Sequence, residues 1–93
     1  MPSRHEVYAA VDSERAYQQF VFEPEGEPHE KNSVTDELVL LDVYLDMAKK
    51  AWTKTRDDEP VLEIMRKIAG IAVRCMENHG APPRMVPRES HQE

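Results

Sequence analysis

The sequence predicts an all-α protein, a three-helix antiparallel bundle, and three observations support this. Apolar residues recur at steps of three and four in three separate stretches, which is the spacing of one face of an α-helix. Residues that start and stop helices flank these stretches, and polar segments join them. We place the helices at about residues 5–21, 33–54 and 59–79, followed by an extended, proline-rich C-terminal tail. Residues 1–93 are expected to form a single helical domain, with flexible ends at 1–4 and 85–93.

The first expected helix carries an acidic residue inside its apolar stripe. That stripe consists of Val7, Ala10, Val11, Tyr17, Phe20 and Val21. Glu14 falls between Val11 and Tyr17, where a carboxylate needs a basic partner or water. Two interpretations remain open. Glu14 pairs with a basic residue, either Arg15 or one on a facing helix, or it belongs to a ligand site.

Residues 23–32 read as an acidic loop, because they include two prolines, a glycine and no apolar side chain. His29 lies there among four glutamates. Its spacing from them matches no metal-ligand pattern, so a solvated loop is the favoured interpretation.

The second expected helix has an apolar face that is too wide for one partner helix. Ser33 and Asp36 are spaced as a capping box at its start. One stripe along it contains Val34, Leu38, Leu41, Leu45, Ala48 and Trp52, and an adjacent one contains Glu37, Leu40, Tyr44, Met47 and Ala51. We therefore expect this helix to lie centrally in the bundle or in an interface between copies. Because a three-helix monomer would not cover so wide an apolar face, we predict a homo-oligomer.

The third expected helix opens at Pro60 and closes at Gly80, the residue types favoured at these positions. Its apolar face is formed by Val61, Ile64, Met65, Ile68, Ile71, Ala72, Cys75 and His79. Ala69-Gly70 is a spot of small residues where another backbone or a ligand could approach, and close helix packing is the favoured interpretation. The polar run 53–59 is short, so the second and third helices should be antiparallel.

Charge and composition narrow the functional classes. The net charge is −6, and residues 1–46 hold eleven Asp/Glu against three Lys/Arg. This balance argues against a nucleic-acid binder, which needs a basic face. Apolar runs such as residues 38–41 are far too short for a membrane span, and no secretion signal is visible. A lone Cys75, expected to be buried, fits a reducing cytoplasm.

Catalytic motifs are weak. Ser33 is expected to cap a helix and Ser13 lies beside acidic residues, so neither is a strong nucleophile candidate. The three glycines are isolated, so there is no phosphate-binding loop. However, the order of ERAYQQF, an acidic loop with a histidine, a capped long helix and EIMRKIAGIAVRCMENHGAPPR resembles small phage-encoded helical proteins of unassigned role. These in turn are distantly similar to the all-α, MazG-like nucleoside triphosphate pyrophosphohydrolases. The resemblance covers about residues 14–84.

The resemblance implies a family in which paired acids on two helices hold magnesium against a triphosphate. This chain departs from that pattern. Leu40 and Leu41 stand three and four residues after Glu37, while Arg66 and Lys67 stand at the same offsets after Glu63. Magnesium requires converging oxygen ligands, so we predict no catalytic residues, no metal site and no cofactor.

We therefore predict a non-enzymatic binding protein for a small nucleotide-like anion. If the chain is phage-encoded, it could be a counter-defence sponge that sequesters a nucleotide immune signal in the host cytoplasm. The candidate phosphate contacts are Arg66, Lys67, Arg74 and Arg84. Tyr44 and Trp52 are candidates for stacking on a base, with Tyr17 as a further aromatic face, and Glu14 and Glu37 for polar selectivity. A module that inhibits a host protein is the first alternative, and a MazG-like hydrolase is the second.

Overall fold

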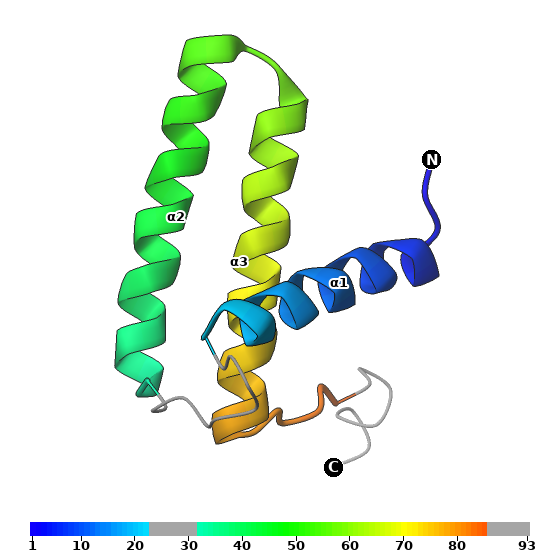
Figure 1. The fold of residues 1–93 in the computed structure, drawn as a ribbon, viewed down its shortest axis with the longest axis vertical. Helices are drawn as coiled ribbons and strands as arrows, with labels where there is room; N and C mark the ends of the chain where they lie inside the picture. Colours follow the sequence, from blue (N-terminus) through cyan, green and yellow to red (C-terminus); the bar gives the residue numbers. More distant parts are fainter. Residues whose placement is uncertain (23–31, 86–93) are drawn as a thin grey trace.

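A computed structural model of the protein describes residues 1–22 and 32–85 and contains three helices in that part of the chain (Figure 1). They are α1 (Arg4–Phe22), α2 (Val34–Thr55) and α3 (Asp58–His79). The predicted all-α three-helix bundle is confirmed, and each helix boundary lies within one residue of its expected position. The acidic stretch 23–31 with His29, and residues 86–93 of the tail, lie outside the described residues.

Reciprocal side-chain caps fix the starts of α1 and α2. The predicted box at α2 is present, because the Ser33 hydroxyl accepts from the amide of Asp36 and the Asp36 carboxylate accepts from the amide of Ser33, both at 3.0 Å. Ser3 and Glu6 form the same arrangement at α1, at 3.1 and 3.0 Å. The sequence reasoning missed this second box, whose spacing is equally visible in the sequence.

A tight turn makes α2 and α3 an antiparallel hairpin, as predicted. Arg56 takes the left-handed conformation (φ 54°, ψ 28°) and its amide donates to the carbonyl of Trp52 at 2.7 Å. Asp57 then caps α3 by accepting from the amide of Glu59 at 3.3 Å. The turn is shorter than the expected run 53–59, because α2 continues through Thr55 and α3 begins at Asp58.

Helix α1 packs across α3 and makes no close backbone approach to α2 within the described residues (Figure 1). The crossing is at Gly70, where a Cβ atom would lie 2.8 Å from Gln18 Nε2 and 2.8 Å from Glu14 Cγ. The interpretation of Gly70 as a close-packing position is therefore confirmed. The N-terminal half of α1 projects sideways, away from the hairpin (Figure 1).

The apolar core of the described residues is very small. Ala48 and Ile71 are the apolar side chains buried there, whereas Glu14, Gln18 and Glu37 are buried polar ones. The stripe expected to bury α1 is instead largely open to solvent, with Tyr17 62% and Phe20 78% exposed. The reason is that α1 crosses α3 at one point and does not lie along it. Cys75, expected to be buried, is half-buried.

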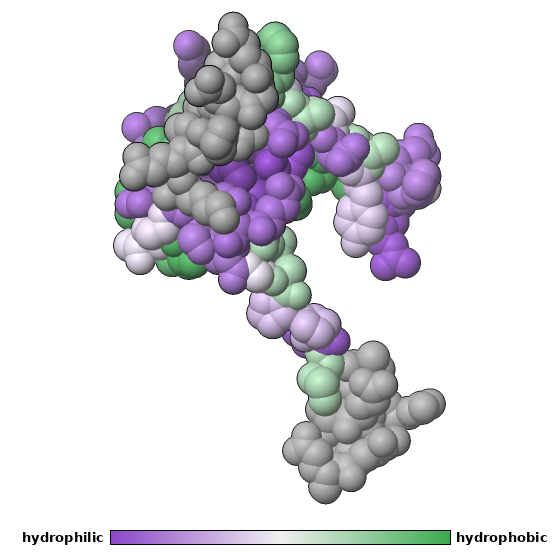
Figure 2. Space-filling model, turned by 60° about the horizontal axis from the view of Figure 1, so that its bottom comes forward, coloured by the Kyte–Doolittle hydropathy of each residue, from purple (hydrophilic) through white to green (hydrophobic). Residues whose placement is uncertain are grey.

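Apolar side chains consequently reach the surface among charged ones, and green and purple residues are mixed over the face shown in Figure 2. The wide apolar face of α2 is only partly covered, since Leu38, Leu45 and Met47 are 59%, 46% and 45% exposed. No helix in the described part of the chain is long and apolar enough to cross a membrane.

Candidate functional site

All three helices contribute to one cavity, which we call the three-helix cavity. It has a volume of about 230 Å³ and is lined by Glu14, Tyr17, Gln18, Val21, Leu40, Tyr44, Lys67, Ile71 and Arg74. A second hollow of about 370 Å³, the outer hollow, is lined by Ser13, Glu14, Tyr17, Arg66 and Lys67. The two share Glu14, Tyr17 and Lys67, so together they reach the size of a small-molecule site.

Glu14 is held by a basic residue on a facing helix, which was one of the open interpretations. Its Oε1 accepts from Arg66 Nε at 2.9 Å, and the residue is only 7% exposed. The crossing at Gly70 brings α1 close enough for this contact. Arg66 uses only Nε in this pair, and its side chain is 39% exposed. Its terminal nitrogens can therefore donate to a further group in the outer hollow.

Glu37 forms a second and more deeply buried pair, with Arg74. Arg74 Nε and Nη2 donate to the two carboxylate oxygens, both at 2.9 Å, and Asn32 Nδ2 donates at 3.0 Å. Burial raises the pKa of Glu37, but the hydrogen bonds from Arg74 and Asn32, with the charges of Arg74 and His79, outweigh it and leave the pKa below its ordinary value. The Asn32 carbonyl in turn accepts from His79 Nε2 at 2.7 Å.

A third interhelical pair joins Arg15 of α1 to Glu77 of α3. Arg15 Nε and Nη2 donate to the two oxygens at 3.0 and 2.8 Å. These hydrogen bonds are the main reason that the pKa of Glu77 is lowered. The contact depends on the crossing angle of α1, which no spacing in the sequence reveals.

Gln18 is the site residue that the sequence reasoning missed. It is 6% exposed, lines the three-helix cavity, and its Oε1 has no hydrogen-bond partner among the described residues. A buried amide oxygen without a partner is costly, so we expect a water molecule or a bound ligand to donate a hydrogen bond to it. A signal was available, because Gln18 stands four residues after Glu14 and therefore on the same face of α1.

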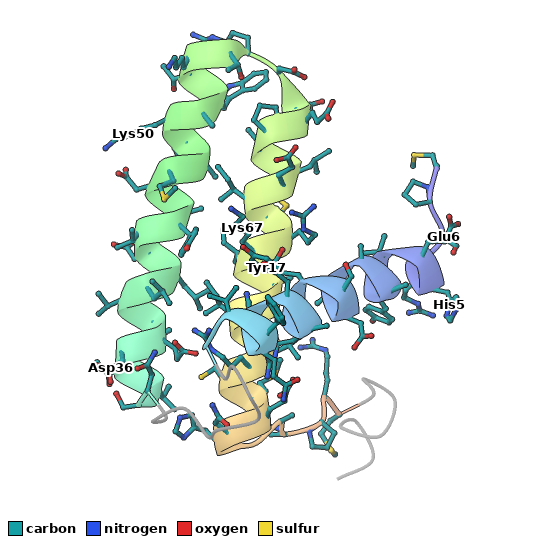
Figure 3. The ribbon with its side chains drawn as sticks, in the orientation of Figure 1. His5, Glu6, Tyr17, Asp36, Lys50 and Lys67 are labelled. Carbon is teal, nitrogen blue, oxygen red and sulfur yellow. The ribbon has the colours of Figure 1, made fainter. Side chains whose placement is uncertain are left out.

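Lys67 and Arg74 are the two cations that line the three-helix cavity, and Lys67 has no carboxylate partner among the described residues. It is exposed and lies beside Tyr17 near the point where α1 crosses α3 (Figure 3). Tyr44 enters the same cavity from α2. The structure thus brings six of the predicted residues together around the two hollows: Glu14, Tyr17, Tyr44, Arg66, Lys67 and Arg74.

Three other candidates lie away from the cavity lining. Trp52 is near the far end of α2, 42% exposed, with the Arg56 guanidinium 5.8 Å from its ring centre. Arg84 is exposed in the segment that follows α3. Glu37 binds Arg74, which lines the cavity, but Glu37 itself does not line the cavity.

Within residues 1–22 and 32–85, no three His, Cys, Asp or Glu side chains are grouped so that they could hold a metal ion. Comparison with known protein families finds no match to this chain. Searches of curated proteins and of solved structures likewise find no similar protein.

Proposed function

We propose that this chain is a non-enzymatic binding protein for a small nucleotide-like anion, held across the three-helix cavity and the outer hollow. The observation that carries the proposal is that Gln18 and Lys67 line the same cavity. Among the described residues, the buried Gln18 Oε1 has no hydrogen-bond partner and Lys67 has no carboxylate partner, and two tyrosines lie beside them. Unmatched polar groups that converge on a hollow are typical of ligand sites.

The outer hollow suits the phosphate. Lys67 offers an ammonium group, and Arg66 offers the terminal nitrogens that Glu14 does not use. Charged donors of this kind make strong hydrogen bonds to phosphate oxygens. Arg74 gives two of its nitrogens to Glu37, so we assign it to holding the site together.

The three-helix cavity suits the base. Tyr17 and Tyr44 supply aromatic faces for stacking, and Gln18 Oε1 can accept a hydrogen bond from an exocyclic amino group or a ring N–H. The proposed ligand therefore carries a base with at least one such donor, together with one or more phosphates.

Binding without cleavage follows from the pairing of the carboxylates. Glu14 and Glu37 each have an arginine within 2.9 Å. A magnesium ion would have to displace a guanidinium group to reach either carboxylate, and the two acids belong to different pairs. Together with the resemblance to phage-encoded proteins, this supports a sponge that sequesters a nucleotide signal and leaves it intact.

The test is calorimetric titration of the whole protein with a panel of linear and cyclic nucleotides, followed by chromatography of the recovered ligand. We expect one ligand to bind and to be recovered unchanged. Lys67→Gln should weaken its binding about tenfold or more, because an ion pair to phosphate is lost. Lys49→Gln is the matched control, since Lys49 is an exposed lysine outside both hollows.

Gln18→Leu should also weaken binding, most strongly for ligands whose base carries a donor. Arg84→Ala tests whether the exposed arginine after α3 contributes to phosphate binding. Equal affinity of the wild type and Lys67→Gln would refute the proposal. Release of a nucleoside monophosphate and pyrophosphate would support the hydrolase instead.

A further inference from the structure

Large apolar side chains are exposed on all three helices in the described part of the chain. Val7, Val43, Leu62 and Met65 are 46%, 50%, 60% and 54% exposed. Apolar surface that the chain itself leaves open can be covered by a partner.

An apolar groove with an acidic rim lies between the N-terminal halves of α1 and α3, on the side where α1 projects from the hairpin (Figure 1). We call it the α1–α3 groove. It has a volume of about 520 Å³, and its apolar lining is formed by Val7, Ala10, Val11, Leu62, Met65 and Ala69. Pro2, Glu6, Glu59, Glu63 and Arg66 also line it, and the charge of Arg66 is paired with Glu14. Leu62 and Met65 are 60% and 54% exposed, so no described part of the same chain covers them.

The chain itself carries a helical surface that complements this groove. We call it the outer stripe of α2, and it consists of Val39, Val43, Met47, Lys50 and Lys54. Their spacing of four, four, three and four places them on one side of the helix. The three apolar members are 61%, 50% and 45% exposed. Lys50 forms an ion pair with Asp46, and this pair is exposed, contributes little and can be exchanged.

The outer stripe of α2 and the α1–α3 groove are complementary in charge when α2 runs antiparallel to α3. Residues 47–56 contain four Lys/Arg and no Asp/Glu, whereas residues 57–63 contain four Asp/Glu and no Lys/Arg. If α2 of a second copy ran antiparallel to α3, Lys54 and Lys50 would face Glu59 and Glu63. Met47 and Val43 would then meet the apolar part of the groove, because ten residues separate Glu59 from Ala69 and eleven separate Val43 from Lys54.

We propose that the α1–α3 groove is the binding site for the outer stripe of α2 of a second copy of this chain. The N-terminal half of α1 of a second copy is a poorer occupant, because Glu6 and Asp12 would be placed against an acidic rim. Leu62 lies outside the three-helix cavity. Failure of this proposal therefore leaves the nucleotide proposal standing, and the reverse also holds.

The first test is the mass of the full chain in solution by light scattering. The wild type should exceed the 10.8 kDa of one chain. Leu62→Glu should lower the mass to that of one chain, because it places a charge in the apolar groove. Leu38→Glu is the control, since Leu38 is 59% exposed but lies on the opposite flank of α2 and outside the groove, and it should keep the wild-type mass.

The second test identifies the occupant by charge reversal. The double variants Glu59→Lys/Glu63→Lys and Lys50→Glu/Lys54→Glu should each associate about tenfold more weakly than the wild type at low salt. An equimolar mixture of the two should recover wild-type association, because the altered groove then meets the altered stripe. The charge-reversal test remains informative even if the Leu62→Glu variant unfolds as a monomer.

A wild type with the mass of one chain would overturn the proposal. So would a Leu62→Glu variant that assembles like the wild type, or charge variants that do not rescue each other. Capture of an unrelated host protein by the groove of a monomeric chain would point to the interaction module instead.

Discussion

The buried acids in this small protein are held by arginines from a neighbouring helix. Glu37 is 1% exposed and receives two hydrogen bonds from Arg74 and one from Asn32. A buried carboxylate with this many donors stabilises the fold only while it is charged and fully paired. The protein thus uses ion pairs at positions where most small bundles have apolar contacts.

This pair makes stability depend on pH in a definite direction. The pKa of Glu37 in the folded protein lies below 4.5, so folding favours the charged form. Its contribution is complete above pH 4.5 and is lost as the pH falls through the folded pKa. We expect Glu37→Gln to lower the free energy of unfolding by about 3 kcal/mol at pH 7. Urea unfolding at a series of pH values should show this difference shrinking below pH 4.5.

Glu77→Gln is the matched control, because it removes a carboxylate that also pairs with an arginine but is 50% exposed. We expect it to cost less than about 1 kcal/mol at the same protein concentration. If the two variants lost equal stability at pH 7, the buried pair would not have the role assigned to it.

At the scale of elements, the crossing of α1 over α3 decides which residues meet. Gly70 lets the two helices approach, and this approach brings Glu14 to Arg66 and buries Gln18. The hairpin of α2 and α3 is fixed separately, by the capping residues and the turn at Arg56 and Asp57. The α1–α3 crossing is therefore the contact on which the cavity depends.

Gly70→Ala should destabilise the protein although alanine favours helices. The new Cβ atom would lie 2.8 Å from both Gln18 Nε2 and Glu14 Cγ, and both side chains are buried. We expect a net loss of about 1–2 kcal/mol in the free energy of unfolding, after the helix-propensity gain is subtracted. Chemical denaturation measures it directly.

Combining Gly70→Ala with Gln18→Ala should cost less than the two single changes added together, because the shorter side chain removes part of the clash. Strict additivity would mean that the two residues do not press on each other. A stabilising effect of Gly70→Ala alone would mean that α1 does not cross α3 at this position.

At the scale of the whole molecule, the described residues bury little apolar surface for a chain that folds into three helices. Ala48 and Ile71 alone cannot offset the conformational entropy that three ordered helices lose. The assembly proposed above supplies the missing burial, because exposed residues of α1, α2 and α3 become covered.

Stability should therefore depend on protein concentration. If folding and association are coupled, the thermal midpoint rises as the concentration rises, because mass action favours the assembled form. We expect an upward shift of several degrees over a hundredfold range, measured by circular dichroism at 222 nm. The Leu62→Glu variant should lose this dependence. A wild-type midpoint that is constant over the range would contradict coupled assembly.

Local features of the sequence were sufficient to predict the helices. The apolar spacing, Ser33 with Asp36, Pro60 and Gly80 placed every helix boundary within one residue. The breadth of apolar surface on α2 and the interruption of the α1 stripe by Glu14 also predicted where packing would be unusual. These properties depend on residues close together in the chain, so the sequence contains them directly.

Only the tertiary structure decided which helices meet and which side chains share a cavity. The sequence could not assign Glu14 to Arg66, Glu37 to Arg74 or Arg15 to Glu77, and it did not single out Gln18. It also grouped Trp52 and Arg84 with residues that lie elsewhere. The physical reason is that helical periodicity defines a face but not the angle at which another helix crosses it, and these angles determine the interhelical pairs.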